Sequence, residues 1–178
     1  SMSNLVNSSG VVSTDVTGVG TGRAGLAAAG YGGDKAVFAY GDDPVVSLKN
    51  LVTNEGVVGN DVTGVGTARR ELAAASYGVG LAIFAYGQNS GGRLSISNKV
   101  NSSGVIASDT SGVGTARRDI AASEYGGDKA AFAYGRTAGA SYLSLKNLVS
   151  NTGTVSADVT GVGTARSSLA AAGYSTSA

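Results

Sequence analysis

The feature that most constrains the fold of this chain is an internal repeat. Four N-[LK]-V stretches begin at Asn4, Asn50, Asn98 and Asn147. Four arginines recur in step with them, at positions 23, 69, 117 and 166, with spacings of 46, 48 and 49 residues. Units of this size bury a core by stacking on their neighbours, as propeller blades and some helical solenoids do. We expect a single repeat domain over residues 1–178, with repeats at approximately 4–49, 50–97, 98–146 and 147–178.

The local pattern decides between β-blades and a helical solenoid. β-branched residues flank Asn54-Glu55-Gly56, a short link with glycine that is typical of a β-hairpin. Its cognates lie at 7–10, 101–104 and 151–153, and we name the strands before and after this link C and D. A second hairpin is predicted around Gly32-Gly33-Asp34, between the apolar runs LAAAGY and KAVFAYG. We name its strands A and B.

The alanine runs in strand A, such as 27–29 and 73–75, leave a short helix as the rival interpretation, because alanine has high helix propensity. Glycines bracket each run and leave too few residues for a stable helix. Small side chains also suit strands crowded around a propeller axis. We therefore predict that A is an inner strand.

Strand B carries recurring aromatic residues. Phe38, Phe84 and Phe132 each precede a tyrosine by two positions. A spacing of two predicts that the phenylalanine and the tyrosine share one face of the strand and pack between neighbouring units. The three phenylalanines are our first predicted core residues.

Composition excludes several classes of function. The chain has 13 Lys plus Arg and 12 Asp plus Glu, for a net charge of +1, and this balance does not suit a nucleic-acid or membrane-surface protein. It contains no Cys and no His, which removes the thiolate nucleophile, the imidazole base and the commonest zinc ligands. We expect no catalytic residues, no cofactor-binding residues and no metal ligands, and hence no enzyme.

The motif D-x-[TS]-G-V-G-T-x-R raises a possible ligand site. It contains Asp15, Asp61, Asp109 and Asp158. A Gly-x-Gly turn after an aspartate can cradle a phosphate or hold a cation. It lacks the lysine of a P-loop and the several carboxylates of a calcium loop. We interpret Asp and Thr as groups that fix a turn, and Arg as a partner for Asp or a carbonyl within or between blades.

Two further sets of side chains are ligand candidates. The tyrosines that end strand A are Tyr31, Tyr77, Tyr125 and Tyr174. Their rings would stack on sugars in a lectin, but packing with the hydroxyl at the surface is favoured. Arg69 and Arg117 each precede a second arginine and an acidic residue. A solvated charged surface is favoured there, and a phosphate-binding patch is the alternative.

The unit RxxLAAAxYGGDKAxFAYG, followed by SLxNLV and D-x-[TS]-G-V-G-T-x-R, resembles a divergent kelch repeat over nearly the whole chain. It is also similar to Gly/Ala/Thr-rich repeat proteins of tailed bacteriophages and large viruses. The resemblance implies an all-β, propeller-like array of four-stranded antiparallel blades. It also implies a viral or bacterial structural protein, and similar repeat arrays are assigned to virion surfaces.

The number of strands leaves the last blade incomplete. The chain starts with C and D, continues through three A–B–C–D sets, and ends after one more A. We expect either a four-bladed ring with an imperfect blade or a ring completed by other chains, as a homo-oligomer. The expected function is a non-enzymatic structural or interaction module that associates with other copies of the repeat or another protein. The alternatives are a multivalent glycan-binding propeller and, with least support, a hydrolase that uses the aspartates.

Overall fold

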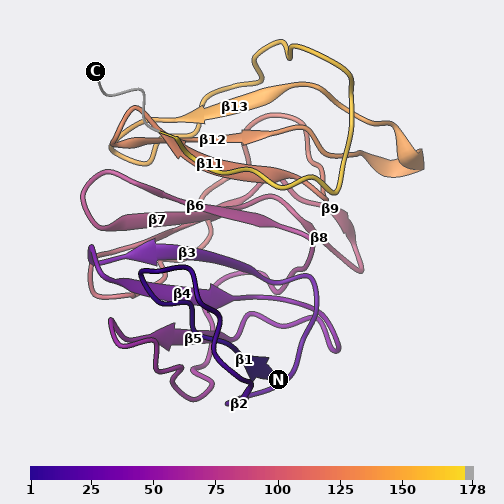
Figure 1. Cartoon of the computed structure of the whole chain (residues 1–178). Coiled ribbons are helices and arrows are strands. Elements are labelled where there is room, and N and C mark those ends of the chain that lie inside the picture. Colours follow the sequence, from indigo (N-terminus) through magenta and orange to yellow (C-terminus); the bar gives the residue numbers. More distant parts are fainter. Residues whose placement is uncertain (175–178) are drawn as a thin grey trace.

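Three antiparallel sheets of three strands each are stacked face to face in the computed structural model, which describes residues 1–174 (Figure 1). The first sheet contains β3 (Ala27–Tyr31), β4 (Lys35–Ala39) and β5 (Lys49–Val52). The second contains β6 (Ala73–Tyr77), β7 (Leu81–Ala85) and β10 (Ser97–Val100). The third contains β11 (Ala121–Tyr125), β12 (Lys129–Ala133) and β13 (Lys146–Val149). The all-β prediction is confirmed for the described residues.

Each sheet has the predicted strand order A, B, C. In the first sheet Phe38 of strand B pairs with Ala28 of strand A and with Asn50 of strand C. The same register recurs around Phe84 and Phe132. The alanine runs are therefore strands. The strands β3, β6 and β11 contact one another from sheet to sheet, because their small side chains allow close approach.

Strand D is shorter than predicted, because it is reduced to isolated bridges with strand C. Val52 pairs with Val58 and Lys49 pairs with Val62, so the register slips by one residue between the two bridges. The same slip occurs in the other two units. An extra residue of this kind is a β-bulge, which interrupts the ladder.

The remaining elements are short. β1 (Met2–Ser3) pairs with β2 (Val16–Thr17) and forms the C–D hairpin layer at the N-terminal end. β8 (Gln88–Asn89) pairs with β9 (Gly92–Arg93), and the 3-10 helix η1 spans Ala138–Ala140. β8, β9 and η1 lie in the segment after strand B whose length differs between repeats. No helix within residues 1–174 is long and apolar enough to cross a membrane.

The core consists of two apolar clusters, one between each pair of sheets. Tyr40 and Phe84 belong to the cluster between the first and second sheets, while Tyr86 and Phe132 belong to the next one. Phe84 and Phe132 are fully buried as predicted, but Phe38 is only half-buried.

The prediction that Phe84 and Tyr86 share one face is wrong. Phe84 packs toward the first sheet and Tyr86 toward the third. Tyr86 has a φ of 64°, as do its cognates within a few degrees, and this left-handed residue ends the strand and breaks the alternation of faces.

The stack is open at both ends. Figure 1 shows the N-terminal layer at one end and the C-terminal segment, which contains no regular strand within residues 150–174, at the other. Leu5 lies against Gly56, which places the N-terminal layer on the first unit, and Gly173 lies against Glu124 of β11. The described residues form no closed ring.

Candidate functional site

A polar network centred on an aspartate recurs between successive units and uses the residues of the D-x-[TS]-G-V-G-T-x-R motif, although in the described part of the chain the bond from arginine to asparagine forms only at Arg23 and Arg117. In the first unit Thr21 donates to Asp61 Oδ2 through its backbone N–H, at 2.8 Å, and through its hydroxyl, at 2.7 Å. Asn50 Nδ2 donates to Asp61 Oδ1 at 2.9 Å. Arg23 Nη2 donates to Asn50 Oδ1 at 2.7 Å. The network ties the segment before strand A to the end of strand D.

The same carboxylate geometry holds in the other units. Asp109 accepts from Thr67 and Asn98, and Asp158 accepts from Thr115 and Asn147. Each aspartate therefore accepts hydrogen bonds from the threonine of the preceding motif, 40 to 43 residues earlier, rather than from its own turn. Sequence reasoning missed this link. The available signal was the constant spacing of 11 residues between the repeat asparagine and the aspartate.

Hydrogen bonds keep these carboxylates ionised. Those from Thr21 and Asn50 hold the pKa of Asp61 below its ordinary value. At Asp109 burial raises the pKa, but the hydrogen bonds from Thr67 and Asn98 outweigh it, so that the net pKa is lowered. Asp158 follows the same pattern. A carboxylate with its oxygens already paired in this way suits a structural role better than proton transfer.

The second glycine of the Gly-Val-Gly turn makes room for the aspartate. Gly66 has a φ of 84°, and a Cβ atom there would lie 2.3 Å from Asp109 Oδ1. Gly20 and Gly114 have the same conformation and meet Asp61 and Asp158 in the same way. Only glycine combines this backbone conformation with so close an approach.

The predicted ligand candidates Arg69 and Arg117 are fully buried between sheets. The guanidinium carbon of Arg69 lies 4.0 Å from the centre of the Tyr40 ring, and that of Arg117 lies 4.1 Å from the Tyr86 ring. Burial lowers the pKa of both arginines, and the facing tyrosine partly offsets it. Arg69 and Arg117 therefore contact other residues of the protein and not the solvent-exposed surface.

The second arginines form ion pairs that link consecutive repeats. Arg70 donates to Asp42 of the preceding repeat, and Arg118 donates to Glu71. Asp119 accepts from Arg136 at 2.6 Å. The acidic residues also take part through their backbones, since the Asp119 N–H donates to the Glu71 carbonyl at 3.0 Å. The charged residues on this surface thus connect consecutive repeats through ion pairs and a backbone hydrogen bond.

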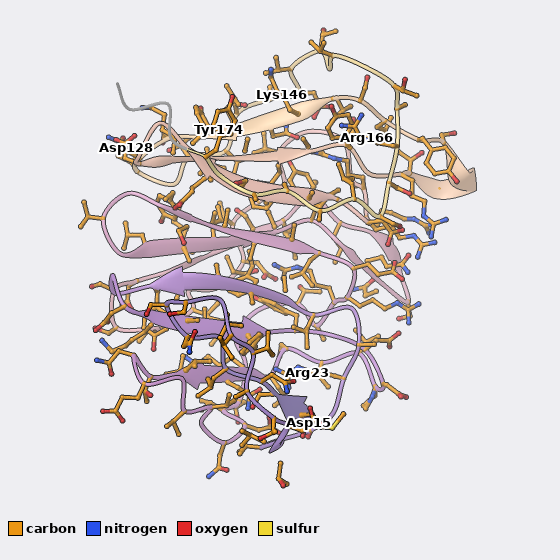
Figure 2. All side chains as sticks on the ribbon, in the orientation of Figure 1. Asp15, Arg23, Asp128, Lys146, Arg166 and Tyr174 are labelled. Carbon is orange, nitrogen blue, oxygen red and sulfur yellow. The ribbon has the colours of Figure 1, made fainter. Side chains whose placement is uncertain are left out.

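The four tyrosines that end strand A are not gathered at one site. Tyr31 and Tyr77 are buried, and their rings lie against Gly104 and Gly153, each in the C–D hairpin of the next sheet in the stack. Tyr125 is exposed, and Tyr174 is 86% exposed near the C-terminal end (Figure 2). Within residues 1–174 no three acidic side chains lie close enough together to hold a metal ion.

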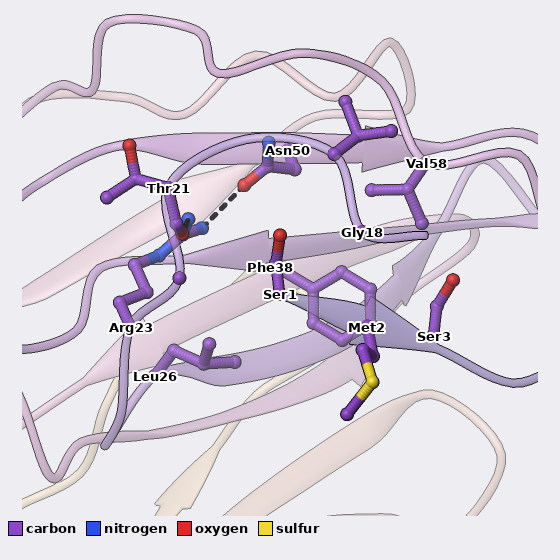
Figure 3. A pocket seen from close by; sticks show the side chains of 12 residues that line it. Ser1, Met2, Ser3, Gly18, Thr21, Arg23, Leu26, Phe38, Asn50 and Val58 are labelled. Atoms are coloured by element: carbon purple, nitrogen blue, oxygen red, sulfur yellow. Dashed lines mark hydrogen bonds between the residues drawn. The ribbon is translucent and has the colours of Figure 1, made fainter. Parts of the chain in front are cut away.

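A cavity of about 280 Å³ opens at the N-terminal end of the stack (Figure 3). It is lined by Arg23, Leu26, Phe38 and Val58, together with residues 1–3. The Arg23 side chain reaches Asn50 across one wall, as the dashed line in Figure 3 shows. Apolar side chains, the polar residues Thr21 and Asn50 and the Arg23 guanidinium thus share the lining of this cavity.

No known protein-family model matches this chain, and no curated protein sequence matches it either.

Proposed function

We propose that this protein is a non-enzymatic structural module, a propeller-like stack of repeats that associates end to end with other copies of the same repeat. The recurring polar side chains support this proposal, because they join one repeat to the next or close a unit on itself. The resemblance to phage and viral repeat proteins suggests a virion-associated scaffold as its setting.

The observation that carries the proposal is that the two end layers hold complementary halves of the network. In the N-terminal layer Asn4 Nδ2 donates to Asp15 Oδ1 at 2.8 Å, and no threonine within the described chain completes this pair. The C-terminal layer carries Thr164 and Arg166, the cognates of the threonine and arginine that contact Asp and Asn in inner units. Figure 2 shows Arg166 and Asp15 at opposite ends of the molecule. The C-terminal layer of one copy therefore carries the threonine and arginine that the N-terminal layer of the next copy lacks.

The N-terminal layer also leaves apolar surface uncovered. Val6 is 63% exposed and Val12 is 61% exposed, whereas their cognates Val100 and Ile106 are 0% and 2% exposed. Stable repeat arrays end in units with a polar outer face, and an apolar patch marks an interaction surface. The N-terminal layer thus carries apolar side chains of the kind that inner repeats bury. We therefore expect a partner to cover it.

Light scattering over a range of protein concentrations tests the proposal. We expect a mass above that of one chain that grows with concentration. Asp15→Asn and Thr164→Ala should each lower this mass, because each removes one half of the shared pair. Thr160→Ala is the matched control, since Thr160 is an exposed threonine outside the network. A chain that stays monomeric at every concentration would refute self-association.

A glycan array separates this function from the lectin alternative. Among the tyrosines that end strand A, Tyr125 and Tyr174 are exposed, so a sugar could reach their rings. Saturable binding to a glycan that is lost in Tyr125→Ser would replace the structural proposal with a binding function. Absence of binding at high protein loading would eliminate the alternative.

A further inference from the structure

The cavity at the N-terminal end has the composition of an interface that already exists twice within the chain. We use the name tyrosine socket for four of its lining residues, Arg23, Leu26, Phe38 and Val58. Their cognates one repeat later are Arg69, Leu72, Phe84 and Ile106. Those in the third repeat are Arg117, Ile120, Phe132 and Val155.

In both internal cases a tyrosine of the preceding repeat fills the socket. Tyr40 lies under Arg69, meets Phe84 edge to face at 5.5 Å between ring centres, and shares a cluster with Leu72. Its hydroxyl donates to the carbonyl of Val65 at 3.1 Å. Tyr86 makes the same set of contacts with the third repeat.

At the N-terminal end the same walls stand around a cavity. Phe38 is half-buried there, whereas Phe84 and Phe132 are fully buried beneath their tyrosines. The Arg23 side chain is held in place by hydrogen bonds to Asn50 and to the carbonyl of Tyr40, at 2.7 Å each. The socket is therefore preorganised, which lowers the cost of receiving an aromatic side chain.

A sheet edge lies beside the socket. The N–H groups of Tyr40, Tyr86 and Tyr134 donate to the carbonyls of Leu48, Ile96 and Leu145. The cognate of these three residues is Met2, in the sequence Ser1-Met2-Ser3-Asn4. Within residues 1–174 no B strand pairs with this edge of residues 2–6. A strand added here would meet backbone groups and the socket together.

We infer that this end accepts an extended segment of another chain, of the strand B type, that ends in Tyr-Gly. The segment pairs antiparallel with residues 2–6 and inserts its tyrosine between Arg23 and Phe38. The inference rests on the proposed function, in which the joined end layers still lack a strand B. The strands β4, β7 and β12 are each the central strand of a sheet, so the added segment comes from a partner other than a copy of this chain. The Arg23 guanidinium can face an aromatic ring, and the carbonyl that corresponds to that of Val65 can accept a hydroxyl hydrogen bond. Both contacts favour tyrosine over an aliphatic residue.

A synthetic peptide tests the inference with the full chain. The sequence KAVFAYG, residues 35–41 of this protein, is titrated into the protein, and KAVFALG serves as the matched peptide. We expect one KAVFAYG peptide to bind per chain and KAVFALG to bind about tenfold more weakly or worse. Bound peptide should also slow amide exchange of residues 3–6.

Protein variants locate the binding end. Arg23→Met should weaken the peptide complex, whereas Arg166→Met should leave it unchanged, because Arg166 already stacks on Tyr134 of its own chain at 3.7 Å. Equal affinity for the two peptides, or no binding of either, would overturn the inference, and this comparison needs no variant to fold. If chains still associate through Asp15 and Thr164 while neither peptide binds, the inference fails and the proposed function stands. If the peptide binds a chain that never self-associates, the inference stands and the proposed function fails.

Discussion

The guanidinium carbon of Arg69 lies 4.0 Å from the centre of the Tyr40 ring, although the two residues belong to consecutive repeats. The same tyrosine meets Phe84 at its edge and donates its hydroxyl to the Val65 carbonyl. One side chain thereby combines cation–π, aromatic and hydrogen-bond contacts at a single repeat interface. Stability should consequently depend on these tyrosines far more than on the exposed Tyr125 that ends strand A in the third sheet.

Truncation of Tyr86 tests this dependence. Tyr86→Leu should lower the free energy of unfolding by about 2–4 kcal/mol, because it removes the ring from both Arg117 and Phe132. Tyr86→Phe removes only the hydroxyl bond to Val113 and should cost about 1 kcal/mol. Urea unfolding gives both values. The exposed Tyr125→Leu is the control, with a change within about 0.5 kcal/mol, and an equal loss there would contradict the assignment.

Alanine variants of two glycines with similar backbone conformations distinguish the cost of a left-handed φ from the cost of a steric clash at Cβ. Gly66 and Gly127 have φ values of 84° and 79°, but a Cβ atom has open space only at Gly127. Gly127→Ala should cost about 1–2 kcal/mol for its left-handed conformation. Gly66→Ala should cost clearly more, because its Cβ would meet the Asp109 carboxylate. Thermal unfolding of the two variants makes the comparison, and equal losses would show that the Asp109 contact is not needed.

Stability should fall at acidic pH. The pKa values of Asp61, Asp109 and Asp158 are lowered from 3.8 in the folded protein. Such groups add stability above the unfolded pKa, and this contribution is lost as the pH falls through the lowered folded values. Urea midpoints measured from neutral pH to about pH 2 should decrease mainly below pH 3.8.

Asp109→Asn provides the control for the pH dependence. It should lower stability at neutral pH by about 1–3 kcal/mol, because an amide has only one acceptor oxygen and cannot accept from both Thr67 and Asn98 Nδ2. It should also flatten the acid dependence relative to the parent chain. A profile with the parent's steepness would assign the acid loss to other groups.

Hydrogen exchange should reveal a gradient along the stack. The second sheet packs between the other two, and Ile83 and Phe84 of β7 are fully buried. Their amides should exchange most slowly, while at protein concentrations too low for association the amides of the exposed N-terminal layer, residues 4–17, should exchange fastest. Uniform protection across the chain would instead indicate that the N-terminal layer is covered by a partner in solution.

The candidate site was only partly predictable from sequence, and strand B shows why. The spacing of Phe84 and Tyr86 identified both as interface residues, but alternation placed them on one face. The left-handed φ of Tyr86 moves its ring to the opposite face, where it meets the third sheet. The left-handed conformation of Tyr86 costs energy locally, and its contacts with the next repeat offset that cost. Rules that consider only neighbouring residues cannot predict these contacts.

The sequence by itself determined the β-class, the strand order A, B, C, the hairpin links and the burial of Phe84 and Phe132. These follow from periodicity and turn chemistry, which act over a few residues. Only the tertiary structure decided that Asp61 reaches back to Thr21, that Arg69 covers Tyr40, and that the stack ends in an open socket beside Phe38. Each of these depends on how one unit is placed against another, and that placement is set by packing between distant segments rather than by the preferences of any single repeat.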